Sequence, residues 1–145
     1  MRTVIQRVRR AQVCSGGQCA SIGVGVLLLV GLEKGDTGET TAWCANKIAG
    51  LRIFGDAEGK MNLPLADVGG EILAVSQFTL AGCIDKGRRP SFDSAMAPSE
   101  ARTMFDVFAS QLKSLGLVVK TGFFQEHMEV ELVNDGPVTF VLDRK

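Results

Sequence analysis

Ten consecutive residues, GVGVLLLVGL at positions 23–32, form the longest apolar run and set the first limit on the fold. A membrane-spanning helix needs about 18–20 apolar residues, so the run is too short to be one. We interpret it as a buried β-strand over residues 23–31. The chain has 145 residues, of which 46% are hydrophobic, which suffices for one domain with its own core. Since we find no repeat and no linker, we expect a single domain over residues 1–145.

Further strands are predicted on both sides of this run. Residues 2–8 have a strand pattern, and Ser15-Gly16-Gly17 predicts a hairpin because glycine readily adopts positive φ. The other predicted strands lie at 51–54, 71–80, 117–121, 127–133 and 137–142.

Two helices are also predicted. The second is the clearer, because Pro98 suits a first helical turn and Gly116 ends an apolar stripe at helical spacing. The stripe consists of Ala101, Met104, Phe105, Phe108, Leu112 and Leu115. For the first helix we predict a capping box at Asp36 and Glu39, and an end at Gly50 in the left-handed conformation. Two helices with seven or more strands indicate an α+β domain.

The charge is balanced overall but uneven along the chain. Sixteen basic residues offset sixteen acidic ones, so the net charge indicates no partner. Two basic groups stand out, one before the first acid at Glu33 and one in a later loop. They contain Arg2, Arg7, Arg9 and Arg10, and Lys86, Arg88 and Arg89. Such groups either bind phosphates or are a solvated strand edge and a charged loop, and the sequence leaves both readings open.

The four cysteines, Cys14, Cys19, Cys44 and Cys83, have neither the Cys-x-x-Cys spacing nor the histidines of a zinc site. We expect free thiols in a reducing compartment. No signal peptide is recognised, so we expect a cytoplasmic protein.

The sequence offers few candidate residues for catalysis by a side-chain general base or nucleophile. The single histidine, His127, stands beside Glu126 at a predicted strand edge, which is typical of a solvated residue rather than of a general base. Dinucleotide and Walker motifs are absent from the sequence. Two polar stretches remain, SQFTL at 76–80 and NDGPVT at 134–139. Local rules alone predict a hairpin turn for the second.

Taken together, these two stretches resemble the signature motifs of the D-aminoacyl-tRNA deacylase family. Other segments agree in the same order: MRTVIQRV, VGLEKGDT, LRIF with EGKMNL, DVGGE and KGRRPSF. The resemblance covers essentially the whole chain. It implies an enzyme that hydrolyses the ester between a D-amino acid and the 3′ end of tRNA, and that also acts on glycine mischarged on tRNA. It further implies a homodimer with a β-barrel-like α+β fold, with no metal, organic cofactor, membrane or DNA partner.

The resemblance also assigns roles. It places catalysis at Ser76, Gln77, Phe78 and Thr79, where we expect backbone N–H groups to stabilise the oxyanion. In the family, the bond corresponding to Gly136-Pro137 is cis and enters the partner subunit's pocket, where it excludes L side chains. Arg7 resembles the residue that holds this motif. A nucleophilic Thr79 is the rival mechanism; we prefer main-chain groups and the substrate's 2′-OH, because no base stands beside Thr79.

For tRNA, we expect Met128, with Phe78 as a second possibility, to contact the terminal adenosine. Arg88 and Arg89 are expected at phosphates, together with Arg9, Arg10 and Lys86. The chain departs from the family in two places. Ala81-Gly82-Cys83 stands where Tyr-Ala-Asp is expected, and the early hairpin carries both Cys14 and Cys19, which allows a disulfide as the alternative to free thiols.

Two other functions are kept open. One is a non-catalytic dimer that binds tRNA ends, because no side-chain base is evident. The other is a general small-ester hydrolase that uses the hydroxyl of Ser76 or Thr79.

Overall fold

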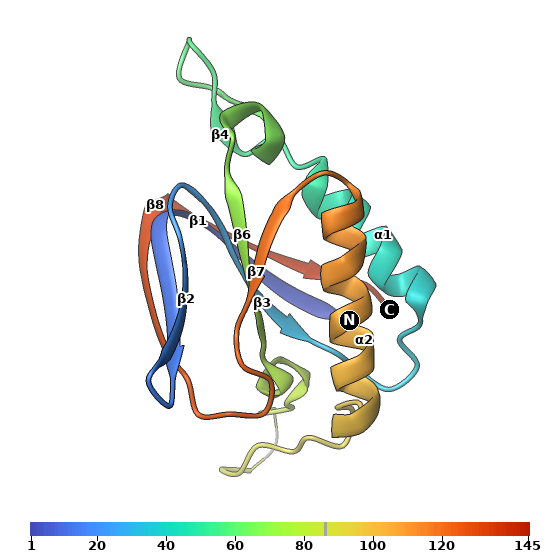
Figure 1. Cartoon of the computed structure of the whole chain (residues 1–145). Coiled ribbons are helices and arrows are strands. Elements are labelled where there is room, and N and C mark those ends of the chain that lie inside the picture. The colour runs from blue at the N-terminus through green and yellow to red at the C-terminus, as the bar shows by residue number, and fades with distance from the viewer. Residues whose placement is uncertain (86) are drawn as a thin grey trace.

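The computed structural model describes residues 1–85 and 87–145. One mixed sheet has the order β2-β1-β3-β6-β7, with β8 paired to the other edge of β1 (Figure 1). The elements are β1 (Arg2–Ser15), β2 (Gln18–Ile22), β3 (Gly25–Gly31), α1 (Gly38–Ala49), β4 (Phe54–Gly55), β5 (Met61–Leu63), the 3-10 turn η1 (Leu65–Val68), β6 (Glu71–Ser76), the 3-10 turn η2 (Phe78–Ala81), α2 (Pro98–Ser114), β7 (Val118–Thr121) and β8 (Glu129–Asp143). The predicted α+β class, with a barrel-like mixed sheet and two helices, is confirmed.

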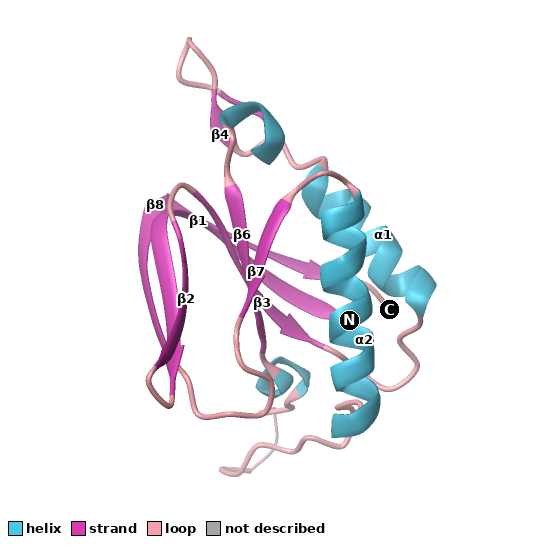
Figure 2. Ribbon diagram, in the orientation of Figure 1, coloured by secondary structure: helices cyan, strands magenta, loops and turns pink. Residues whose placement is uncertain are grey.

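Strand β1 organises the sheet because its two halves have different partners. Residues 2–8 pair with β3, residues 11–15 pair with β2, and β8 follows the opposite edge along both halves. Figure 2 shows β1, β2 and β8 curving away together from the parallel strands β3, β6 and β7.

The apolar run that forms β3 is buried on both sides of the sheet. Leu28 lies in the larger core with α1 and α2, which cover one face. Leu27 points into a smaller cluster on the other face. This double burial explains why β3 is continuously apolar rather than alternating. Within the part of the chain that the structure describes, no helix is long and apolar enough to span a membrane.

The helix ends differ in part from the prediction. Helix α2 begins at Pro98 and ends at Ser114, just before Gly116, as predicted, and Gly116 has φ +83°. The capping box of α1 is wrong by one residue, because Thr37 and Thr40 form it. The carboxylate of Asp36 instead accepts the backbone N–H of Glu33 at 2.7 Å. The predicted left-handed end at Gly50 is also wrong, since its φ is −88°.

Three strand predictions need correction. The strand at 51–54 is reduced to Phe54–Gly55, paired with β5. The strand at 71–80 ends at Ser76, where its pairing with β3 ends and the chain turns into η2. The two strands at 127–133 and 137–142 are one strand, β8, because both halves pair with β1.

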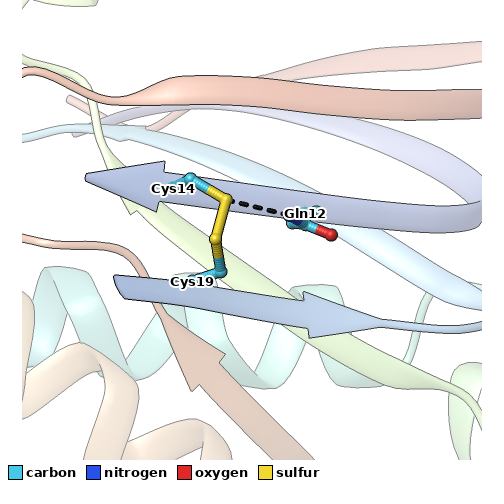
Figure 3. The surroundings of a disulfide bond; sticks show 3 residues. All are labelled: Gln12, Cys14 and Cys19. Carbon is cyan, nitrogen blue, oxygen red and sulfur yellow. Dashed lines mark hydrogen bonds between the residues drawn. A yellow bond between two sulfur atoms is a disulfide. The ribbon is translucent and has the colours of Figure 1, made fainter. Parts of the chain in front are cut away.

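The prediction of free thiols is wrong for Cys14 and Cys19, which form a disulfide (Figure 3). Gly16 and Gly17 have φ +53° and +83°, the two positive values that a two-residue hairpin turn of type I′ requires. This turn places Cys14 directly opposite Cys19 across β1 and β2. Cys44 and Cys83 are free. Burial raises the pKa of the Cys44 thiol.

Candidate active site

A pocket of about 720 Å³ lies where β6 ends and η2 begins. Three segments line it: the SQF stretch, the loop before α2 with the start of that helix, and the loop between β7 and β8. The lining residues are Leu32, Val75, Ser76, Gln77, Phe78, Phe92, Ala95, Met96, Ala97, Pro98, Ala101, Phe124, Gln125, Glu126, His127, Met128 and Val130. Three of the four residues expected to be catalytic, Ser76, Gln77 and Phe78, therefore share one pocket, whereas Thr79 is not among those that line it.

The backbone at the start of η2 has free donors. The N–H of Gln77 donates to the carbonyl of Val30 at 2.8 Å and is therefore occupied. Phe78 and Thr79 are the first residues of η2, and the first N–H groups of a helix have no partner within it. Within the described residues, neither N–H reaches an acceptor. Two of the three donors expected in this stretch therefore have no partner among the described residues, and Phe78 carries the one that belongs to a pocket-lining residue.

The hydroxyls of the stretch lack an activating partner. The side-chain amide of Gln77 donates to Thr79 Oγ1 at 2.5 Å. Among the described residues, no carboxylate or imidazole bonds to the hydroxyl of Ser76 or Thr79. His127 is exposed, as expected of a solvated residue, but it lines the same pocket together with Glu126.

Apolar and aromatic side chains form walls of the pocket. Phe78 is 57% exposed, and its ring centroid lies 5.1 Å from that of Phe92. Met128 is half-buried, and its sulfur accepts the backbone N–H of Phe123 at 3.3 Å. Gly82, in the stretch that departs from the family, leaves room for Phe92, because a Cβ there would lie 2.9 Å from the ring. Sequence reasoning assigned no role to Phe92, although it ends the KGRRPSF segment, and it missed the start of α2, which carries no motif of its own.

The NDGP stretch is a bulge in β8, so the predicted hairpin turn is wrong. Gln6 pairs with Thr139 and Val8 pairs with Asn134, which leaves residues 135–138 opposite Arg7 alone. The peptide bond between Gly136 and Pro137 is cis, and both residues are exposed.

Side chains anchor the base of this bulge. Arg7 donates from Nε to the carbonyl of Asp135 at 2.9 Å and from Nη1 to that of Ile53 at 2.6 Å. The amide of Asn134 donates to the carbonyls of Arg7 and Val138, at 2.8 and 2.9 Å. The bulge is therefore held at its base and exposed at its tip. None of residues 134–139 is among the described residues that line the pocket of the same subunit.

The basic residues have different surroundings. Arg9 and Arg10 lie beside carboxylates, at 3.4 Å from Asp135 and 3.8 Å from Glu131. Arg88 and Arg89 are exposed in the loop that also supplies Phe92 to the pocket. Lys86 lies outside the described residues. No group of three or more His, Cys, Asp or Glu side chains suited to a metal ion occurs in 1–85 or 87–145.

Comparison with known proteins identifies the family. A solved structure named c-Myc DNA unwinding element binding protein superposes with a TM-score of 0.93 at 39% identity, covering 100% of this chain and 99% of that one. A probable eukaryotic D-amino acid tRNA deacylase has the same fold, with a TM-score of 0.82 at 18% identity over 99% and 98% of the two chains. The D-aminoacyl-tRNA deacylase of Geobacter sulfurreducens is 56% identical over 146 residues, covering 100% of this chain and 96% of the relative. The family model described as D-Tyr-tRNA(Tyr) deacylase matches residues 4–143, and the chain therefore belongs to this family of hydrolases.

Proposed function

We propose that the protein hydrolyses the ester bond between a D-amino acid and the 3′ end of tRNA, and that it also releases glycine mischarged on tRNA. The observation that supports this most is the pocket beside the free N–H groups of Phe78 and Thr79, in a chain of this family. An aminoacyl ester is already activated, so catalysis needs a place for the oxyanion more than it needs a strong nucleophile.

In the proposed mechanism, water adds to the ester carbonyl and the bond to the ribose 3′ oxygen breaks. The water's proton passes to that oxygen, with assistance from the neighbouring 2′-OH of the tRNA. The N–H groups of Phe78 and Thr79 stabilise the oxyanion, at about 10²–10³ in rate for each donor. Holding the ester and the water in place contributes further. The side chain of Thr79 has no role as nucleophile in this mechanism, because the one hydrogen bond of its hydroxyl among the described residues is to the amide of Gln77.

Selection against L-amino acids is assigned to the Gly136-Pro137 bulge of a second copy. The exposed tip of the bulge and its absence from the pocket of its own subunit support a homodimer in which each copy completes the other's site. Main-chain carbonyls near the substrate's α-carbon exclude an L side chain by contact but accept any D side chain. Glycine passes this filter because it has no side chain to exclude.

The tRNA end is assigned to the surfaces around the pocket. Met128 and Phe78 offer apolar surface for the terminal adenosine. Arg88 and Arg89, which are exposed in the same loop as Phe92, are proposed to contact phosphates. A cytoplasmic location and independence of metals and cofactors remain predictions.

The test is multiple-turnover release of amino acid from D-tyrosyl-tRNA with a metal chelator present. Release of many equivalents per subunit supports the enzyme; tight tRNA binding without release supports the tRNA-end-binding dimer instead. A small activated ester serves as the control substrate, because a general esterase using Ser76 or Thr79 would cleave it as well. Duplex DNA as a competitor tests the expectation that DNA is not a partner, which the name of one structural relative makes worth measuring.

Mixing two defective variants tests the shared site. Gly136→Ala alters the bulge, and Ala97→Trp fills the pocket from an exposed position. A mixed dimer has one site with both defects and one with neither. Recovery of activity upon subunit exchange is expected, whereas no recovery, with exchange demonstrated, would contradict a filter supplied by the partner.

A further inference from the structure

The β1–β2 hairpin touches one wall of the pocket. Ser15, the last residue of β1, donates from Oγ to Oε2 of Glu126 at 2.6 Å. Glu126 and its neighbour Gln125 both line the pocket. Ser15 immediately follows Cys14, so the disulfide lies one residue from the hydroxyl that contacts the wall.

This wall, residues 122–128, depends on contacts from outside. Gln125 has φ +64°, a left-handed conformation that residues other than glycine rarely adopt. Such a conformation persists only where its surroundings impose it. The residues on either side of Gln125 are both held. Arg102 lies 4.7 Å over the ring of Phe124 and donates to its carbonyl at 3.4 Å, and Ser15 holds Glu126.

The end of the hairpin needs the disulfide to keep Ser15 in place. Its turn consists of two glycines, which have the greatest backbone freedom. Its second strand, β2, has only five residues. Strand β8 pairs with β1 only as far as Cys14, so Ser15 and the turn extend beyond this pairing and can open locally. The Cys14–Cys19 bond closes it one residue pair from the turn.

We propose that Ser15 is a positioning residue for the pocket wall, and that the Cys14–Cys19 disulfide keeps it there, so that opening this disulfide weakens substrate binding. The inference rests on the proposed function for its substrate, and on the hydrogen bond from Ser15 to Glu126 for its coupling. The reaction at the ester is unchanged; only the fit of the wall at Gln125 and Glu126 changes.

The opening reaction needs a dithiol as reductant. One of its thiolates attacks the sulfur of Cys19, which is the exposed member of the pair. The Cys14–Cys19 bond breaks, and Cys14 leaves as a thiolate that accepts the side-chain N–H of Gln12, now 2.8 Å from its sulfur (Figure 3). The second thiol of the reductant then displaces Cys19 from the mixed disulfide. The pair gains two electrons and two protons, and the dithiol becomes a disulfide.

The experiment measures KM and kcat for D-tyrosyl-tRNA with the disulfide closed and after opening by dithiothreitol. Reactive thiols are counted in both states. In the closed form only the exposed Cys83 is expected to react, because Cys44 is buried. We expect KM to rise about tenfold on opening, as for removal of one hydrogen bond to a charged group, with kcat changed by less than about twofold. An unchanged KM in protein whose pair is shown to be open would overturn the proposal.

Three variants separate positioning from general stability. Ser15→Ala is expected to have the raised KM in both states and to be insensitive to dithiothreitol. Ser15→Thr restores the hydroxyl and is expected to restore both the low KM and the response. Ser21→Ala, an exposed serine on the same hairpin, is the matched control and should behave as the unmodified protein. A Ser15→Ala variant that still responds to dithiothreitol would contradict the coupling.

Hydrogen–deuterium exchange over residues 122–128 measures the coupling between the disulfide and the pocket wall, and it does not depend on catalytic activity. Exchange should become faster on opening in the unmodified protein and should already be fast in Ser15→Ala. Absence of D-tyrosyl release in both redox states, with this exchange response intact, would reject the proposed function alone. An exchange rate over residues 122–128 that changes neither when the disulfide opens nor in Ser15→Ala would reject the inference.

Discussion

Arg7 joins two segments that lie far apart in the sequence, through hydrogen bonds to the carbonyls of Ile53 and Asp135. Its side chain is only 14% exposed, so Arg7→Ala leaves both carbonyls without this charged donor. We expect the free energy of unfolding to fall by about 1.5–3 kcal/mol, measured by urea denaturation. Arg9→Ala is the matched control, since Arg9 is 73% exposed and its pair with Asp135 should contribute about 0–1 kcal/mol. Equal losses from both variants would contradict the anchoring role of Arg7.

Thr79 tests the assignment of catalysis to the main chain. Thr79→Ala removes the hydroxyl but keeps the backbone N–H, so the proposed mechanism predicts a fall in kcat of no more than about tenfold, below the 10²–10³ expected for loss of an oxyanion donor. Single-turnover deacylation of D-tyrosyl-tRNA measures this directly. A loss of several orders of magnitude, in a variant of normal stability, would return the hydroxyl of Thr79 to the role of nucleophile.

At the scale of elements, the role of the bulge in strand β8 can be tested by substituting one glycine. A Cβ on Gly136 would lie 2.1 Å from the backbone nitrogen of Val138, so Gly136→Ala must displace the bulge. We expect a loss of about 1–3 kcal/mol of stability, as for other overpacked sites, together with loss of D-specific deacylation. Gly38→Ala, at the first residue of α1 with open space around it, is the control and should change neither. Normal activity in Gly136→Ala would contradict the role of the bulge.

The helices and strands also show which parts of the fold local sequence patterns predict correctly and which they do not. Helix α2 was predicted correctly because its apolar stripe reports directly on the face that packs against the sheet. The same rules failed at the NDGP stretch, since a turn and a bulge both favour glycine and proline. Only the pairing of β1 with both halves of β8, at least 115 residues away, decides between them. The end of β6 was missed for a similar reason, because SQFTL has strand propensity but β3 offers no partner beyond Val30.

The candidate site was predictable where it carries a motif. Ser76, Gln77 and Phe78 were found from the family resemblance and do share a pocket. Ala97 and Gln125 were not, because the small or polar side chains that line the rest of the pocket have no distinctive pattern. The Cys14–Cys19 disulfide depended on register: a shift of one residue across the hairpin would have left the two thiols apart.

For the whole molecule, a neutral chain that binds tRNA must do so through local charge. We therefore predict that the double variant Arg88→Ala/Arg89→Ala reduces the slope of log affinity against log salt by about 0.7–0.9 for each phosphate that the variant no longer neutralises. Lys113→Ala is the control, because Lys113 lies in the last turn of α2 whereas the first turn lines the pocket. Fluorescence anisotropy with labelled tRNA gives the slopes. Identical slopes for all three proteins would remove Arg88 and Arg89 from the tRNA surface.

The central claim is that a backbone site hydrolyses the ester and selects by chirality, and the most direct test is paired deacylation of D-tyrosyl-tRNA and L-tyrosyl-tRNA. Both substrates are given to the same preparation with a chelator present, and release of tyrosine is followed over time. The account predicts rapid loss of the D ester while the L ester survives at its uncatalysed rate. Comparable loss of both esters would contradict the chirality filter, and survival of both would contradict the hydrolase.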